Sequence, residues 1–310
     1  MALNFPKTGQ IHVRKVWTQS RREVAAFYLL ISPWLLGFLV FVLGPMLASL
    51  VLSFTQWDIL TPPQWIGLGN YVKMMQDPLF WQSLKVSMLY AVMAVPLGLI
   101  VSLGMAVLLN QNVRGLRLFR TLFYLPSVVS GVAVMILWLY IFNPDIGLLN
   151  SFLGDFGIKG PAWVFSPRWA LPSMVIMSLW GAGGGMLIWL AGLKGIPEYL
   201  YEAAKIDGAS SRQRFRYVTL PMLSPTIFFN LITGMIGALQ AFSQAYVMTN
   251  GGPLNATLFL NLYLFNNAFV DFNMGYASAL AWVLFLIILL MSLLVIRSSS
   301  MWVYYEGERK

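Results

Sequence analysis

The sequence contains no cysteine and only one histidine, His12, among its 310 residues. Without cysteine the chain cannot form a disulfide, use a thiolate nucleophile or hold a metal through sulfur. One imidazole in a polar arm also cannot supply the ligand set of a zinc or haem site. We therefore expect no metal and no cofactor, and we expect His12 to be a solvated residue.

Charge is scarce as well, because Asp, Glu, Lys and Arg make up 10% of the chain, against 58% hydrophobic residues and a mean hydropathy of +0.71. Soluble domains are about 25% charged, so this composition excludes a soluble enzyme and predicts an integral membrane protein in a lipid bilayer. The formal charge of +9 does not indicate a nucleic acid partner. Its cations are divided among several loops instead of forming one basic patch.

Six stretches without a charged residue are each long enough to contain the roughly 20 residues that cross a bilayer. They cover residues 24–57, 86–113, 121–144, 169–193, 217–270 and 272–296. The fifth stretch is interrupted by Asn-Gly-Gly-Pro at 250–253, so we place its span at about 221–249. The apolar segment 258–270 is too short to cross and is expected to lie at the membrane interface. The predicted fold is all-α with six transmembrane helices.

Lysine and arginine are distributed unevenly between the two sides of this topology. Sixteen of the twenty cations fall on the side that holds both termini, and cation-rich loops stay in the cytoplasm. They are Lys7, Arg14, Lys15, Arg21, Arg22, Arg114, Arg117, Arg120, Lys194, Lys205, Arg212, Arg214, Arg216, Arg297, Arg309 and Lys310. We predict a cytoplasmic arm at 1–24, a transmembrane domain at 25–297 and a cytoplasmic tail at 298–310. The polar residues ahead of the first apolar run favour an uncleaved anchor.

None of the six predicted spans contains Asp, Glu, Lys, Arg or His. Proton-coupled transporters and voltage sensors rely on buried ionisable groups, and hydrolases need carboxylates, a metal or an activated nucleophile. The sequence also lacks the G-x-x-x-x-G-K-[ST] phosphate loop. We predict that the chain is not an enzyme and that another chain supplies the energy for any transport.

The loop at 194–221 predicts two short helices separated by a turn. Pro197 suits a first helical position and Glu198 places an acid in the first turn. Asp207 and Gly208 form a stop signal, because glycine adopts the left-handed conformation that ends many helices.

A second short helix is expected to start after Ser210 or Ser211, either of which can cap it, and Pro221 is expected to open the next span. Such a helix–turn–helix in a cytoplasmic loop is suited to docking on a rigid partner.

This loop resembles the cytoplasmic signature of permease subunits of ATP-binding-cassette (ABC) importers, E-A-A-x3-G followed after nine residues by an apolar residue and x-L-P. Its members here are Glu202, Ala203, Ala204, Gly208, Val218, Leu220 and Pro221. Val218 replaces the more usual isoleucine. Over roughly 25–300, segments such as "SPWLLGFLVFVLGP", "LAGLKGIPEYLYEAAKIDGAS" and "TNGGP" are similar to the branch that includes the maltose and glycerol-3-phosphate permeases.

The resemblance implies the type I ABC importer permease fold and the bacterial cytoplasmic (inner) membrane. It implies a second homologous permease subunit, two ABC ATPase subunits and an extracytoplasmic sugar-binding protein as partners. The residues that it implies for coupling to the ATPases are Glu202, Ala203, Ala204, Asp207 and Gly208.

Gln240 and Gln244 lie four residues apart in the fifth predicted span, where one helix would place them on one face. An amide in hydrocarbon needs hydrogen-bond partners, which either another helix or a substrate can supply. The resemblance favours a substrate, because the maltose permease holds its sugar on this helix and on the preceding one. The candidate substrate-binding residues are Ser178, Trp180, Gly181, Asn230, Gln240, Ser243, Gln244 and Tyr246.

The sequence thus predicts a permease subunit that forms half of the path for a sugar or oligosaccharide. An importer of glycerol phosphate or another small polar solute is an alternative, although an anion favours a cation or a helix N-terminus in the path. A secondary transporter that carries the same loop is a further alternative. The run Gly-Ala-Gly-Gly-Gly at 181–185 fits either a substrate path or close helix packing.

Overall fold

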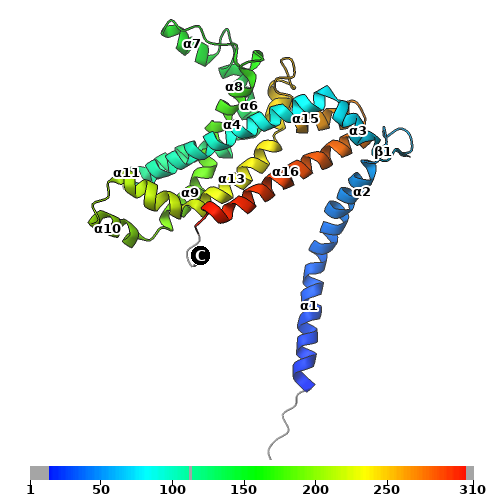
Figure 1. The fold of residues 1–310 in the computed structure, drawn as a ribbon, viewed down its shortest axis with the longest axis horizontal. Coiled ribbons are helices and arrows are strands. Elements are labelled where there is room, and N and C mark those ends of the chain that lie inside the picture. The colour runs from blue at the N-terminus through cyan, green and yellow to red at the C-terminus, as the bar shows by residue number, and fades with distance from the viewer. Residues whose placement is uncertain (1–13, 112–113, 305–310) are drawn as a thin grey trace, which may run out of the picture. The chain divides into compact units, whose positions relative to one another are not determined.

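The computed structural model describes residues 14–111 and 114–304 (Figure 1). The cytoplasmic positions predicted for Lys7, His12, Arg309 and Lys310 fall outside these residues. The chain divides into two compact units, Met1–Leu52 and Ser53–Lys310.

The first unit is one long helix. It comprises α1 (Arg14–Phe38), the π-helical turn η1 (Leu39–Leu43) and α2 (Gly44–Leu52). Between residues 21 and 52 no described side chain is buried, and this apolar segment is long enough to cross a membrane. The first predicted span is therefore confirmed, although its helix ends at Leu52 because Thr55 and Gln56 enter a β-hairpin.

The second unit contains three further long apolar helical segments and two bent ones. The long ones are α4 (Pro78–Leu109), α13 (Ser224–Leu239) with α14 (Ser243–Met248), and α16 (Met274–Trp302). In the bent pairs, α5 (Leu116–Tyr124) with η2 (Leu125–Val128) meets α6 (Gly131–Ile141) at 96°, and α8 (Ala170–Trp180) meets α9 (Gly183–Lys194) at 51°. With each bent pair as one span, the described residues contain the six predicted spans.

The two bends follow from the local sequence. Pro126 lies in the 3₁₀ turn η2, and Val129 after it is extended, so the helix cannot continue smoothly into α6. Gly181 ends α8 and Gly183 begins α9. Glycines at this junction stabilise a helix weakly and leave room for a bend.

The core of the second unit is built around α4, which packs against α8, α9, α13 and α15 (Leu260–Phe265) (Figure 1). One buried cluster gathers Tyr90, Phe142, Met174 and Phe259, and another gathers Met186, Trp189, Leu193 and Leu223. Across the second cluster the indole Nε1 of Trp189 donates to Ser102 Oγ at 2.9 Å. This bond fixes α9 against α4.

The segment 258–270 forms α15 and the π-helical turn η5 (Asn266–Val270). Leu258, Phe259, Leu260 and Leu262 are each at most 5% exposed, and the Leu260 amide donates to Ser87 Oγ at 2.8 Å. The segment does not cross the bundle as a span, and its position at the membrane interface stays a prediction. Its first half is buried because its apolar side chains pack against α4 and α16.

Short elements occupy the two ends of the bundle. One end carries the hairpin of β1 (Thr55–Gln56) and β2 (Gln64–Trp65), with Thr55 opposite Trp65, and α3 (Gly69–Gln76). The loop between α6 and α8 contains α7 (Leu148–Asp155) and η3 (Trp163–Phe165). The other end of α4 lies near α10 (Glu198–Ile206) and α11 (Ser211–Arg214), which continue through η4 (Phe215–Thr219) into α12 (Leu220–Met222) (Figure 1).

Candidate functional site

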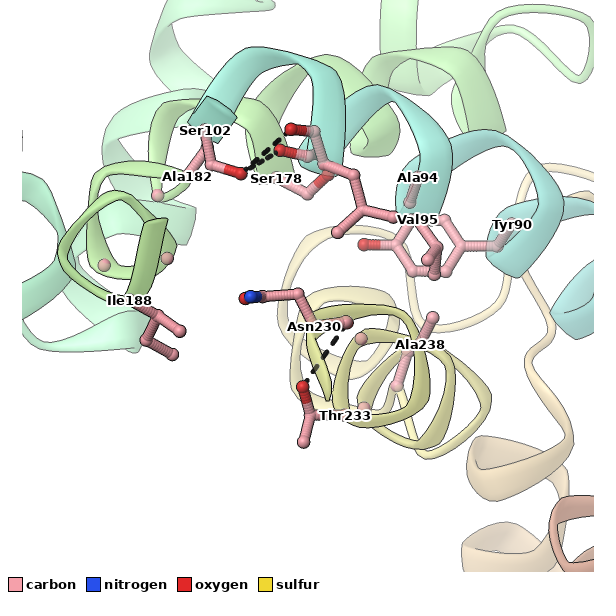
Figure 2. Close-up of a pocket in the computed structure, with 18 of the residues that line it drawn as sticks. Tyr90, Ala94, Val95, Ser102, Ser178, Ala182, Ile188, Asn230, Thr233 and Ala238 are labelled. Atoms are coloured by element: carbon pink, nitrogen blue, oxygen red, sulfur yellow. Dashed lines mark hydrogen bonds between the residues drawn. The ribbon is translucent and has the colours of Figure 1, made fainter. Parts of the chain in front are cut away.

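A cavity of about 520 Å³ lies between α4, the α8–α9 junction and the α13–α14 segment. This volume falls within the range of roughly 300–1,000 Å³ that small-molecule sites occupy. Figure 2 shows its lining from α4, α9 and α13. The polar side chains that line it are Tyr90, Ser102, Ser178, Asn230, Thr233 and Gln244.

Small residues create the space. Gly181, Ala182, Gly184 and Gly185 line the cavity from the bend between α8 and α9. Gly183 faces the other way, since a Cβ there would lie 1.8 Å from the carbonyl oxygen of Phe123 on α5. The sequence left open whether the run at 181–185 lines a path or packs helices closely. The structure shows both, because Gly183 packs against α5 and its neighbours leave space in the cavity.

Three lining hydroxyls are held by hydrogen bonds to backbone carbonyls, and in one of them Ser178 Oγ donates to the carbonyl of Val175 at 2.7 Å. Ser102 Oγ donates to the carbonyl of Gly98 at 2.7 Å and accepts the bond from Trp189. Thr233 Oγ1 donates to the carbonyl of Phe229 at 2.8 Å. All three hydroxyls donate to the scaffold.

Asn230 offers free hydrogen-bonding capacity. Its Nδ2 donates to the carbonyl of Thr226 at 2.8 Å, while no bond to Oδ1 is formed within the described part of the chain. The residue is 9% exposed and extends from α13 into the open space opposite Ile188 (Figure 2). An amide oxygen in this position is suited to accept a hydrogen bond from a ligand.

A second polar group lies deeper, where Tyr90, Ser178 and Gln244 meet. Tyr90 is 5% exposed, and its hydroxyl lies beside the side chains of Ser178 and Gln244. Figure 2 shows the hydroxyl pointing into the cavity. The Nε2 of Gln244 is buried and has no acceptor among the described residues. Since buried polar atoms are nearly always hydrogen-bonded, the unpaired amide is available to a polar ligand.

The structure brings together four of the eight residues that the sequence predicts for the site, namely Ser178, Gly181, Asn230 and Gln244. Trp180, Gln240, Ser243 and Tyr246 do not line the cavity. Trp180 packs edge-on against Trp138, and Tyr246 stacks on Phe242 with ring centres 5.3 Å apart.

The prediction that Gln240 and Gln244 share a helix face is wrong. Helix α13 ends at Leu239, and α14 starts only at Ser243 after a non-helical Phe242. Gln240 is exposed and does not line the cavity, and its backbone carbonyl accepts a bond from Asn261 Nδ2 at 3.0 Å.

Sequence reasoning missed Tyr90, Ser102 and Thr233, which α4 and α13 bring to the cavity. Their only signal is a polar group inside an apolar stretch. Hydroxyls are common in membrane helices because they bond to the backbone one turn earlier, so this signal does not separate a ligand site from a satisfied helix.

The loop between α9 and α13 has the predicted helix–turn–helix. Gly208 has φ +77° and closes α10, with its amide bonded to the carbonyl of Lys205 at 3.0 Å and the amide of Ala209 bonded to Ala204 at 2.9 Å. Ser210 caps α11 through a reciprocal pair of bonds with Gln213. The predicted stop and cap are confirmed.

Two details of this loop differ from the prediction. Pro197 is the N-cap of α10 and not its first helical residue. The next span begins at Ser224, after Pro221, because Leu223 interrupts the helix. Ile206 is 86% exposed at the end of α10, so the loop presents apolar surface beside its predicted docking residues.

Comparison with known proteins agrees with the permease fold described above. Residues 94–301 match the family described as binding-protein-dependent transport system inner membrane component. A probable ABC transporter permease protein, YesP of Bacillus subtilis (strain 168), is 48% identical over 295 residues, which cover 94% of this chain and 95% of that protein.

Several relatives carry names that state a solute, among them the following two. The lactose transport system permease protein LacF of Rhizobium radiobacter is 38% identical, covering 89% of this chain and 96% of that protein. The trehalose/maltose transport system permease protein MalF of Thermococcus litoralis is 34% identical, covering 86% and 91%.

A chain of the crystal structure of a bacterial ABC transporter involved in the import of the acidic polysaccharide alginate has a TM-score of 0.81 at 23% identity, covering 93% of this chain and 99% of that chain. It shares the type I importer fold that the sequence predicts. The chain belongs to the binding-protein-dependent transport system inner membrane components, the permease subunits of ABC importers.

Proposed function

We propose that this permease forms one half of the translocation path for a neutral sugar or oligosaccharide, and that the cavity holds the sugar. The buried, unpaired amide of Gln244 beside Tyr90 and Ser178 carries the proposal. Sugars offer hydroxyl groups that accept from an amide N–H and donate to an amide oxygen, here Asn230 Oδ1. The names of the lactose and trehalose/maltose relatives support this class of solute.

The lining favours a neutral solute over glycerol phosphate. No charged side chain is among the residues of the described chain that line the cavity. A phosphate needs a cation or a helix N-terminus to replace its hydration.

The partners follow from the family and stay part of the proposal. A second permease completes the path, and two ABC ATPases bind Glu202, Ala203, Ala204, Asp207 and Gly208. A binding protein delivers the sugar outside. The related alginate transporter was crystallised with a periplasmic protein bound to an alginate pentasaccharide, which supports the last of these partners.

The fold offers a direct route from the ATPases to the sugar. Helix α9 leads from Gly184 and Gly185 at the cavity to Lys194 at the loop, and α13 returns from Ser224 to Leu239. Both helices line the cavity. Movement of α10 and α11 on nucleotide-driven closure of the ATPases therefore displaces two walls of the site, because packed helices transmit displacement as rigid bodies.

Replacing Gln244 with alanine is expected to lower sugar uptake several-fold to about tenfold, the effect of losing one hydrogen bond of roughly 0.5–1.5 kcal/mol. Gln240→Ala is the matched control, since it removes the same amide from a position outside the cavity. Uptake of lactose, maltose and maltotetraose is measured per assembled complex. Equal losses in both variants, or a lower yield of complex with unchanged uptake per complex, would contradict the assignment of the cavity.

We further propose that the arm 1–24, the loop with Lys205 and the tail 298–310 face the cytoplasm, and that 25–297 is the transmembrane domain. The absence of cysteine allows a clean test. A Lys205→Cys variant should resist a membrane-impermeant maleimide in intact cells and react after lysis, whereas Lys159→Cys should react in intact cells. The opposite pattern would reverse the topology.

A further inference from the structure

A second pocket, of about 480 Å³, lies at the end of the bundle that carries the hairpin and α3. Figure 1 shows β1 and α3 beside the start of α16, at the far end of α4 from α11. The pocket is lined by residues of the β1–β2 hairpin, of α3 and of the start of α16. Nothing in the transport cycle proposed above uses this pocket.

The walls of the pocket are fixed by the backbone. Asn70 is 6% exposed, and its Nδ2 donates to the carbonyls of Ser53 at 2.9 Å and Thr55 at 2.8 Å. The amide of Gly275 donates to the carbonyl of Trp57 at 3.3 Å, and a Cβ on Gly275 would lie 2.0 Å from the carbonyl oxygen of Thr55. The hairpin is thus held tightly to α3 and α16.

A polar cluster behind the pocket holds Tyr276 in place. Its hydroxyl donates to Asp77 Oδ2 at 2.6 Å, and Asp77 also accepts from the Tyr263 hydroxyl and the Leu79 amide. Burial raises the pKa of Asp77, but these three bonds outweigh burial and hold the pKa below its usual value. The ammonium of Lys73 lies 4.6 Å from the ring centre of Tyr276.

Three amide side chains that face the pocket are, by contrast, not used by the scaffold. The amides of Gln56, Gln64 and Asn273 form no side-chain hydrogen bond within the described residues, and no carboxylate there pairs with Lys73. Asp58 accepts two bonds from Thr61, both through Oδ1. Because these bonds lower the pKa of Asp58, it stays charged with Oδ2 open.

We propose that this pocket is an outer saccharide subsite, which binds one sugar unit before or while the solute enters the path. Three amides, one ammonium and one carboxylate provide donors and acceptors in a mixture that matches hydroxyl groups, and Trp57 provides an aromatic surface. Asp58 and Lys73 contribute one charge of each sign, so the pocket has no net charge that would select an anion. The subsite rests on the proposed function, since it requires that the transported solute is a sugar.

The test uses the complete transporter in nanodiscs, with saturation-transfer NMR of lactose, maltose and maltotetraose. To weaken binding in the cavity, all variants carry Gln244→Ala, and the comparison is made only between proteins that share this change. Gln64→Ala with Asn273→Ala should weaken binding by about tenfold or more, as expected for the loss of two hydrogen bonds. The matched control is Gln76→Ala, which removes an exposed amide of α3 that does not line the pocket.

Equal saccharide binding in the double variant and in the Gln76 control would overturn the subsite. Unchanged saccharide binding with weaker binding of the periplasmic protein would also overturn it, and would make the pocket part of a docking surface. Failure of the proposed function gives a different result. In that case the wild-type transporter takes up none of the three sugars, and both the sugar-transport function and the outer subsite are wrong.

Discussion

Gly183→Ala is expected to unfold the cavity region, although it adds only one methyl group. The added Cβ would lie 1.8 Å from the carbonyl oxygen and 2.8 Å from the carbonyl carbon of Phe123. Both are backbone atoms of α5, so no side-chain rotation relieves the clash. Overpacking of a well-packed site costs about 1–3 kcal/mol and sometimes more.

The measurement is the thermal unfolding midpoint and the yield of monodisperse protein after purification. Gly237→Ala is the matched control, because Gly237 lies in a helix and lines the same cavity, but a Cβ there meets no atom within 4 Å. Alanine at an unobstructed helical position stabilises by about 0.5–1 kcal/mol. If the Gly183→Ala protein unfolds at the wild-type temperature, α9 does not pack as closely on α5 as the structure shows.

The positions of the spans were predictable because two simple quantities determine them, the thickness of the hydrocarbon core and the exclusion of charge from it. The bends were not. A straight span and a bent one have the same composition, and Pro126 or the glycines at 181–185 only permit a bend. Whether one forms depends on packing, as the contact of Gly183 with the backbone of Phe123 shows.

The turn at Gly208 was predictable for a different reason. Its determinants are local, since Asp207, Gly208 and Ser210 act on backbone groups within a few residues. The cavity depends on distant residues, and Tyr90 reaches Ser178 and Gln244 only after α4, α8 and α14 have packed. The break after Leu239 that separates Gln240 from Gln244 contains neither proline nor glycine, so it has no local sign in the sequence.

Gly208→Val is expected to abolish most sugar uptake while leaving the cavity able to bind sugar. A Cβ at Gly208 meets no atom within 4 Å, so the effect is conformational and not steric crowding. Its φ of +77° costs a residue with a side chain about 1–2 kcal/mol, and a β-branched residue is an outlier there. Relief of this strain breaks the bonds from Gly208 to Lys205 and from Ala209 to Ala204.

Loss of those two bonds frees α11 to rotate relative to α10, and the surface that we propose for the ATPases is then no longer preformed. Gly208→Asn is the matched control, because asparagine tolerates the left-handed region better than other residues with side chains. The valine variant should co-purify with less ATPase than the wild type and the asparagine variant, with sugar binding by saturation-transfer NMR unchanged in all three proteins. Normal ATPase co-purification and wild-type uptake for Gly208→Val would remove the docking role from this turn. A parallel loss of sugar binding would indicate instead that the turn supports the fold of α9 and α13.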